Sequence, residues 1–367
     1  METVIECTDI DDMVAFFTGD LGFRIELITP ADDPAECVIH GHGARLRMIR
    51  SETDRPVRLR LNVAADFGDG ERELTAPNGT TVELARQSAV VQIPVSNATL
   101  SVVRASASDA FGSGRAGMGY RDLLPDRWGG RFIASHILIV DGGDVADYVH
   151  FHRIRFQMIY VAAGWVDVVY EDQGEPFRMY AGDCVLQPPE IRHRVLRSSP
   201  GLEVIEIGCP AEHDTLVEHD IALPTTVVDP DRDFGGQRFV RHVAADSDAD
   251  VTDPYRDGFV HRDTGIDAAT DGLADARVLT MPAESNGPES TLTHRGEFAM
   301  SVVLAGSAHL TVRHVDETHE FRVASRDAVA FPPGSRWTWA ERTADFELLQ
   351  VVLPADCVKA ADGDHAG

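Results

Sequence analysis

Lysine is almost absent from this sequence of 367 residues, in which Lys359 is the only one. Arginine therefore carries nearly all of the positive charge. The 33 basic residues stand against 60 acidic ones, which gives a formal net charge of −27. Nucleic acids and anionic membrane surfaces are bound by basic protein faces. The composition therefore excludes nucleic acid and membranes as expected partners of this chain.

The sequence also lacks long hydrophobic runs and a recognisable targeting segment. No run approaches the roughly 18 apolar residues that a membrane-spanning helix needs. Residues 1–6 contain neither the basic region nor the apolar region of a signal peptide. We therefore expect a cytoplasmic location.

Cysteines are few, and no Cys-x-x-Cys pair occurs. The five are odd in number and far apart, at Cys7, Cys37, Cys184, Cys209 and Cys357. This pattern predicts reduced thiols rather than disulfides. We interpret Cys184, on an expected strand, as a small buried apolar residue rather than a catalytic thiol.

The length of the chain predicts two or three domains. Helix-type periodicity is rare outside the first of them. In residues 1–88, a short strand at 4–7 precedes a helix whose apolar face lies at 13–17. Three further strands, each bounded by turn residues, follow between 21 and 49. The sequence therefore predicts a small α+β module with the order βαβββ.

Two peptides of this module, FFTGDLGF at 16–23 and APNGTTVEL at 76–84, resemble the glyoxalase/bleomycin-resistance (vicinal oxygen chelate) superfamily. The resemblance places Glu6 and Glu83 near metal-ligand positions of that family. The module is shorter than the two-module domain of the family. We therefore expect a structural or dimer-forming module, and a homodimer. Residues 89–125, with a stretch rich in Gly, Ser and Ala, are expected to be a linker.

In residues 126–228, short β-type segments alternate with turn signals about every 8–12 residues, which is typical of a jelly roll. His150 and His152, two residues apart on one expected strand, point to the same face. Together with Gln157 and His193 from neighbouring strands, they can converge on a divalent metal ion. The sequence therefore predicts a site of three imidazoles and one amide oxygen.

The spacing of these residues resembles the two motifs of the cupin superfamily: Gly143-x6-His150-x-His152-x4-Gln157-x6-Gly164, then Gly182-x5-Pro188-x-Glu190-x2-His193-x3-Arg197. Three residues depart from the usual motifs. Gln157 replaces a glutamate, Glu190 a glycine and Arg197 an asparagine. The resemblance implies a barrel that holds one divalent metal ion per chain. Cupins include dioxygenases, isomerases, cyclases, lyases and binding proteins, so the resemblance does not identify the reaction.

An internal repeat indicates a second barrel in residues 234–356. FQMIYVAAG and AGDCVLQPPEIRH in the first barrel align with FAMSVVLAG and SRDAVAFPPGSRW in the second. The four ligand places are taken in the repeat by Leu292, His294, Ala299 and Trp337. One histidine cannot hold a divalent ion without other ligands. The expected fold is thus mainly β: two tandem cupin jelly-roll barrels, the second degenerate and without metal, after the α+β module.

The neutral donor set leaves the full 2+ charge on the ion, which favours an anionic, chelating substrate such as an enol, diketone, hydroxy acid or aromatic diol. We expect Fe(II), with Mn, Ni or Zn as alternatives, and a dioxygenase reaction. The alternatives are a non-redox isomerase, cyclase or lyase, and a small-molecule binding module. Tyr148 shares the strand parity of His150, and Arg197 that of His193. Tyr148 is therefore a candidate proton donor, and Arg197 a candidate clamp for a substrate carboxylate.

Overall fold

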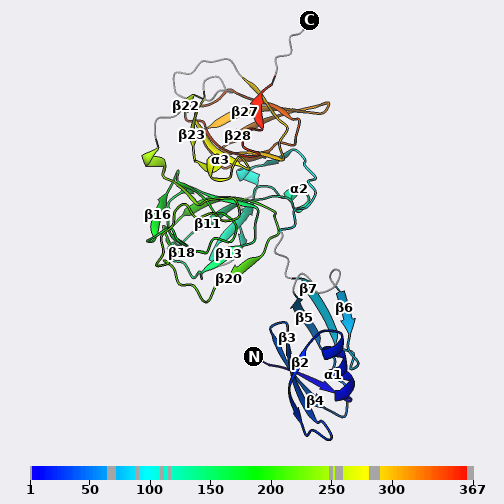
Figure 1. Cartoon of the computed structure of the whole chain (residues 1–367). Coiled ribbons are helices and arrows are strands. Elements are labelled where there is room, and N and C mark those ends of the chain that lie inside the picture. The colour runs from blue at the N-terminus through cyan, green and yellow to red at the C-terminus, as the bar shows by residue number, and fades with distance from the viewer. Residues whose placement is uncertain are drawn as a thin grey trace. The chain divides into compact units, whose positions relative to one another are not determined.

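The structure is a computed structural model that describes residues 2–63, 72–86, 91–107, 111–114, 117–247, 251–252, 259–280 and 290–361. The chain divides into two compact units, Met1–Val90 and Val91–Gly367. The expected fold class is confirmed: a small α+β module precedes two β-barrels (Figure 1). No helix of the described part is both long and apolar enough to cross a membrane. All five cysteines are free thiols.

The first unit begins with the expected βαβββ order. A four-stranded sheet has the order β1-β4-β3-β2, with β1 parallel to β4. The side chain of Asp9 caps α1 by accepting a hydrogen bond from the backbone N–H of Asp12 at 3.0 Å. The helix buries Ile10, Met13 and Phe17 in the core of this unit. The elements are β1 (Thr3–Cys7), α1 (Ile10–Gly19), β2 (Arg24–Thr29), β3 (Glu36–Gly41) and β4 (Ala44–Arg50).

A three-stranded sheet completes the described part of this unit. Its order is β5-β7-β6, with β5 (Arg58–Val63) parallel to β7 (Thr81–Arg86) and β6 (Arg72–Thr75) antiparallel to it. Leu61 and Val82 of this sheet belong to the same apolar core as α1. The resemblance to the vicinal oxygen chelate superfamily and the expected homodimer stay predictions.

The first barrel consists of two sheets. The larger has the order β21-β17-β14-β19-β11-β10-β9, and the smaller has the order β16-β15-β18-β13-β20, with β12 also paired to β18. The strands of the larger sheet are β9 (Gly112–Ser113), β10 (Gly119–Asp122), β11 (Ile133–Ile139), β14 (Phe156–Ala163), β17 (Cys184–Leu186), β19 (Leu202–Cys209) and β21 (Val240–His242). Those of the smaller are β12 (Gly143–Asp144), β13 (His150–His152), β15 (Trp165–Tyr170), β16 (Phe177–Tyr180), β18 (His193–Ser198) and β20 (Thr215–Val217).

The second barrel repeats this plan, with sheets of the order β22-β23-β24-β31-β26-β29-β8 and β28-β27-β30-β25-β32. The first contains β8 (Ser101–Val103), β22 (Val251–Thr252), β23 (Val260–Asp263), β24 (Asp275–Thr280), β26 (Phe298–Ala305), β29 (Ala328–Ala330) and β31 (Glu347–Leu353). The second contains β25 (Thr291–His294), β27 (Ser307–His314), β28 (Glu317–Ala324), β30 (Arg336–Ala340) and β32 (Val358–Ala360). Short helical segments, α2 (Arg127–Gly130) and α3 (Ile266–Ala269), lie between the strands.

The barrels exchange strands, which corrects the expected domain boundaries. β8 precedes the first barrel in the chain but pairs with β29 of the second, and β21 follows the first barrel and pairs with its β17. Residues 89–125 contain β8, β9 and β10, so this range contributes to both barrels rather than forming only a linker. Strands of two or three residues are too short to show an alternating pattern in the sequence.

A shared apolar core and ion pairs join the two barrels. The ring of Phe132 stacks on that of Phe298 with centroids 4.3 Å apart. Glu297 of the second barrel accepts hydrogen bonds from Arg155 at 2.9 Å and Arg131 at 2.5 Å. These contacts hold the pKa of Glu297 at about 2. The barrels therefore form one packed unit, in which the first barrel is supported from one side by the second.

Candidate metal centre

Three histidines converge inside the first barrel, as the sequence predicts. His150 and His152 lie two residues apart on β13, and His193 of the adjacent β18 pairs directly with His150. The ligand atoms of the three rings lie within 4.8 Å of one another. The ring centroids of His150 and His193 are 4.2 Å apart, and that of His152 is 5.2 Å from each. In the described residues, this is the one group of His, Cys, Asp or Glu side chains that is arranged to hold a metal ion.

Hydrogen bonds at Nδ1 fix the orientation of these rings. His150 Nδ1 lies 2.8 Å from the carbonyl oxygen of Tyr148, and His193 Nδ1 lies 3.0 Å from that of Ile191. A carbonyl oxygen only accepts, so both rings donate from Nδ1, and the lone pair of each ring in its neutral form lies on Nε2. His152 Nδ1 lies 3.0 Å from the hydroxyl of Thr215. The donor set therefore fits a divalent metal ion bound by Nε2 atoms.

Gln157 lies in the same cavity on β14, where it is 2% exposed. Its Nε2 donates a hydrogen bond to Oε1 of Glu206 on β19, at 2.5 Å. Because the amide nitrogen makes this contact, Oε1 is the atom of Gln157 that can bind a metal ion. Sequence reasoning missed Glu206. The alternation of inward side chains at Leu202 and Val204 on the expected closing strand was the signal that could have identified it.

The cavity around these residues has a volume of about 710 Å³, including the space at its open mouth. The ring of Tyr170 stacks on that of His193 with centroids 5.5 Å apart. Burial raises the pKa of Tyr170, so its phenol keeps its proton. The cavity therefore suits a small molecule with an apolar body and one polar end, since most of its wall is apolar: Met118, Ile137, Ile139, Ile159, Val166, Val168, Met179, Val195, Leu202 and Val204.

Tyr148, the expected proton donor, does not line this cavity. The strand begins only at His150, so the parity of the strand does not extend back to Tyr148. Its side chain is 43% exposed, and its ring packs edge-on against that of His150 with centroids 5.9 Å apart. The backbone carbonyl oxygen of Tyr148 does contribute to the site, because it accepts the hydrogen bond that orients the His150 ring.

Arg197, the expected carboxylate clamp, points away from the cavity. Between β15 and β18 the register shifts: Val168 pairs with Val195, but Asp167 pairs with Arg197. The extra residue, Leu196, forms a bulge that reverses the parity beyond Val195. The side chain of Arg197 is therefore 60% exposed and lies 3.7 Å from Asp144. Counting parity from His193 failed because a bulge has no sequence signature here.

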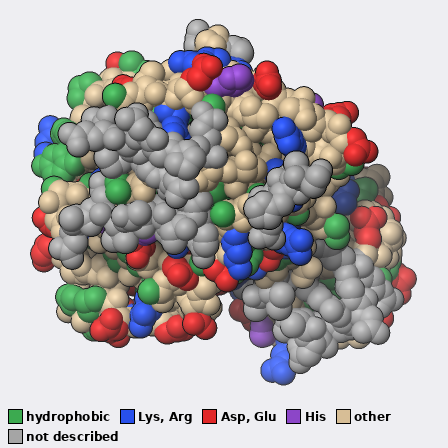
Figure 2. Space-filling view, turned by 90° about the horizontal axis from the view of Figure 1, so that it is seen from above, with side chains coloured by type: hydrophobic (Ala, Val, Ile, Leu, Met, Phe, Trp, Pro, Cys, Tyr) green, Lys and Arg blue, Asp and Glu red, His purple; other side chains and the backbone are tan. Residues whose placement is uncertain are grey.

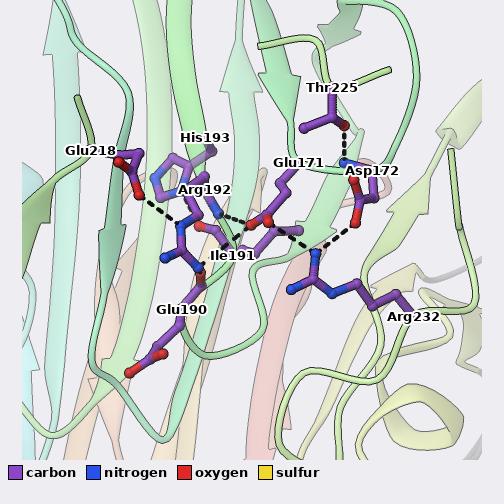
Figure 3. A network of polar contacts seen from close by, with 9 residues as sticks. All are labelled: Glu171, Asp172, Glu190, Ile191, Arg192, His193, Glu218, Thr225 and Arg232. Atoms are coloured by element: carbon purple, nitrogen blue, oxygen red, sulfur yellow. Dashed lines mark hydrogen bonds and ion pairs between the residues drawn. The ribbon is translucent and has the colours of Figure 1, made fainter. Parts of the chain in front are cut away.

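A network of ion pairs holds the chain at the start of β18 (Figure 3). Arg192 lies between two carboxylates: its Nε is 3.4 Å from Glu218, and its backbone N–H donates to Glu171 at 3.1 Å. Arg232 then connects Glu171, at 2.9 Å, with Asp172, at 2.6 Å. The network fixes the backbone directly before His193, the first residue of β18.

Glu190, where the cupin motif usually has glycine, adopts a left-handed backbone conformation with φ of 61°. For a residue with a side chain this conformation costs roughly 1–2 kcal/mol. The backbone N–H of Glu190 donates to the carbonyl oxygen of His152 at 3.0 Å, and its carboxylate lies 3.4 Å from Arg153. These contacts offset the strain and connect the turn to β13, which carries His150 and His152.

A fourth histidine lies next to the site. The ring of His213 packs edge-on against that of His152 with centroids 5.2 Å apart, and its Nδ1 lies 3.1 Å from the carbonyl oxygen of Pro210. His213 follows β19 in a segment without motif spacing, and sequence reasoning did not select it. Its Nδ1 contact positions the ring beside His152, but His213 does not line the cavity.

The corresponding place in the second barrel is filled by side chains. Trp337 is fully buried and stacks on Phe331 with centroids 4.2 Å apart, and Leu292 and Ala299 lie in the same core. His294 Nε2 lies 2.7 Å from the carbonyl oxygen of Phe331.

The two carboxylates singled out in the first unit are engaged by arginine. Glu6 lies 3.1 Å from Arg55, and Glu83 lies 3.7 Å from Arg58 and 3.6 Å from Arg60. Each carboxylate therefore has a cationic neighbour of its own.

No family model and no curated protein matches the sequence. Solved structures share the fold over about three quarters of the chain. A mutant of Bacillus subtilis oxalate decarboxylase has a TM-score of 0.52 at 13% identity, over 73% of this chain and 80% of that one. A second structure of that enzyme, with Mn(II) centres, has a TM-score of 0.52 at 11% identity over the same shares. The protein Ylba from E. coli has a TM-score of 0.50 at 10% identity, over 72% and 94%. At these identities the likeness concerns the fold alone.

Proposed function

We propose that the first barrel binds one divalent metal ion per chain through His150, His152 and His193, with Gln157 as fourth ligand, and that the protein is a metal-dependent enzyme. The convergence of three ring nitrogens within 4.8 Å carries this proposal. Imidazole ligands suit Fe, Mn, Ni and Zn. We expect Fe(II), and the fold likeness to an enzyme with Mn(II) centres supports Mn(II) as the alternative.

The substrate that fits the cavity is a small molecule with a chelating, oxygen-rich end and an apolar body. The aliphatic wall binds the body and excludes water, while the polar end meets the histidines and Gln157. We propose an anionic enol, diketone, hydroxy acid or aromatic diol. Its negative charge is attracted by a 2+ ion whose ligands are neutral.

We propose dioxygenation as the reaction. When bound, a redox-active ion supplies charge stabilisation for the chelated oxygens and a centre for O2 chemistry. The chain supplies a mainly apolar cavity, which limits the access of water to reactive species. The contact between Gln157 and Glu206 keeps the amide in one orientation during turnover.

The position of Glu206 favours a second candidate, a non-redox lyase or isomerase. A carboxylate within the cavity can receive or deliver a proton, which such reactions require. The fold likeness to a decarboxylase agrees with this chemistry but does not select it.

The first experiment measures metal by elemental analysis in protein purified without added metal. We expect about one ion per chain in the wild type and less than about a tenth of that in His152→Ala, since one of three imidazoles is lost. His213→Ala is the matched control, because its ring touches His152 without lining the cavity. Unchanged metal content in His152→Ala would contradict the site.

The second experiment separates the two reactions. Protein loaded with Fe(II) or with Zn(II) is given a panel of diketones, hydroxy acids and aromatic diols, and O2 consumption is recorded. A dioxygenase consumes O2 only with the redox-active ion. Full turnover without O2, with either metal, would replace dioxygenation by the lyase or isomerase.

A further inference from the structure

Positive side chains gather on the outer face of the five-stranded sheet in the second barrel, away from the proposed metal centre. Thr293 on β25 pairs directly with Arg336 on β30 and with Lys359 on β32. Directly paired residues of antiparallel strands point to the same face. The neighbours of Thr293 along the strand, Leu292 and His294, are buried, so this face is the outer one. Arg336 and Lys359 thus flank Thr293, with backbones about 10 Å apart.

These residues line a groove of about 1420 Å³, including the space open to solvent. Arg295, at the end of β25, lines it as well, and Asp356 contributes the one carboxylate among its lining residues in the described part of the chain. Three cations against one carboxylate give the groove a formal charge of +2. The chain as a whole has −27, and Figure 2 shows acidic side chains scattered over the described surface, with arginine and lysine between them.

Two of the three cations have no counter-charge within ion-pair distance in the described part of the chain. Across the described residues, neither Arg295 nor Lys359 forms an ion pair, although Asp356 lines the same groove. Many other arginines of the chain do, for example Arg155 with Glu297 at 2.9 Å. Among the described residues, the single lysine and one arginine of this groove therefore have no ion-pair partner, and their charges can attract an external anion.

We infer that this groove binds a small dianion, either a phosphate group or a dicarboxylate. The planar guanidinium of arginine binds both kinds of oxyanion through two parallel hydrogen bonds, and lysine adds a point charge. The formal charge of +2 on the groove is equal and opposite to the charge of the dianion. The site is independent of the metal centre, and its ligand class does not depend on the reaction proposed there.

The scarcity of lysine provides a direct assay. Because Lys359 is the only lysine, limited acetylation with an amine-reactive ester modifies one side chain, and mass spectrometry of its peptide gives the rate. The α-amino group of the same protein is the internal control. At equal ionic strength, inorganic phosphate or succinate should slow acetylation of Lys359 at least threefold without slowing that of the α-amino group, and chloride should have no effect. If only phosphate slows the acetylation of Lys359, the ligand carries a phosphate group. If only succinate slows it, the ligand is a dicarboxylate.

Variants of exposed residues test the geometry. Arg295→Ala and Arg336→Ala should each raise the dianion concentration needed for half-protection about tenfold. Arg313→Ala is the matched control: Arg313 on β27 pairs directly with Arg336 but does not line the groove. It should change this concentration less than twofold. Equal acetylation with and without both dianions would overturn the inference, as would protection that persists unchanged in Arg295→Ala and Arg336→Ala.

Discussion

The contact between Gln157 and Glu206 makes Gln157→Glu an informative variant of the metal centre. The amide of Gln157 donates to Glu206 at 2.5 Å within the barrel. A glutamate at position 157 keeps the shape but replaces the donor with a second carboxylate oxygen. In the metal-free protein the carboxylate at the buried position 157 would then face the partly buried carboxylate of Glu206, and one of the two must take up a proton.

Two limits set the size of the effect. Repulsion between unit charges about 3 Å apart amounts to roughly 5.5 kcal/mol at an effective dielectric constant of about 20. Protonating an ordinary glutamate at pH 7 costs less, about 3.7 kcal/mol, because its usual pKa is about 4.3 and each pH unit adds about 1.4 kcal/mol. Protonation therefore prevails. We expect the free energy of unfolding to fall by about 3–4 kcal/mol at pH 7, and the loss to vanish near pH 4.

Urea unfolding of chelator-treated protein at pH 7 and pH 4.5 measures this loss. The double variant Gln157→Glu/Glu206→Gln exchanges the amide and the carboxylate across the same contact, so it should recover most of the stability at pH 7. If the double variant is as unstable as Gln157→Glu, or if the loss is equal at both pH values, repulsion between these two side chains is not its cause.

Two further variants test the carboxylates of Asp275 and Glu203 through the pH dependence of urea unfolding. Burial raises the pKa of Asp275 to about 6, so its ionisation lowers stability as the pH rises from about 4 to 6. Asp275→Asn should therefore stabilise the protein by about 2 kcal/mol at pH 7 and have no effect near pH 4; destabilisation at pH 7 would contradict this. His136 and Arg326 lower the pKa of Glu203 to about 2. The ionised Glu203 therefore adds to the free energy of unfolding above pH ~4.5, and this stabilisation is lost as the pH falls toward 2. Glu203→Gln should remove about 1 kcal/mol of the acid sensitivity, since the carboxylate is partly exposed; equal acid sensitivity in both proteins would refute this.

The sequence predicted those parts of the site that depend on short, regular stretches. His150 and His152 share a face because they lie two residues apart on one strand, and the motif offset brought His193 beside them. The predicted placement of Tyr148 and Arg197 in the cavity was wrong for local reasons. Tyr148 precedes the strand, and Arg197 follows a bulge. Strand parity holds only where the strand is regular.

Features that depend on pairing between distant segments were not visible in the sequence. Glu206 lies beside Gln157 only because β19 and β14 pair in one particular register. The same holds for β8 and β21, whose three residues carry no periodic signal. The repeat predicted two barrels. It also predicted that Leu292 and Trp337 occupy, in the second barrel, the places of His150 and His193 in the first. It could not show that the barrels share strands.

The exchange of β8 and β21 also affects when each barrel can be completed during synthesis of the chain. A chain emerges from the ribosome with its N-terminus first, so β8 is made long before β29, to which it binds through the pair Val103 and Ala328. Pairing between segments so far apart in the chain closes slowly. The first barrel likewise cannot be completed before β21 has been synthesised. A nascent chain that has reached only residue 228 still has the edge of β17 open to pairing with other chains.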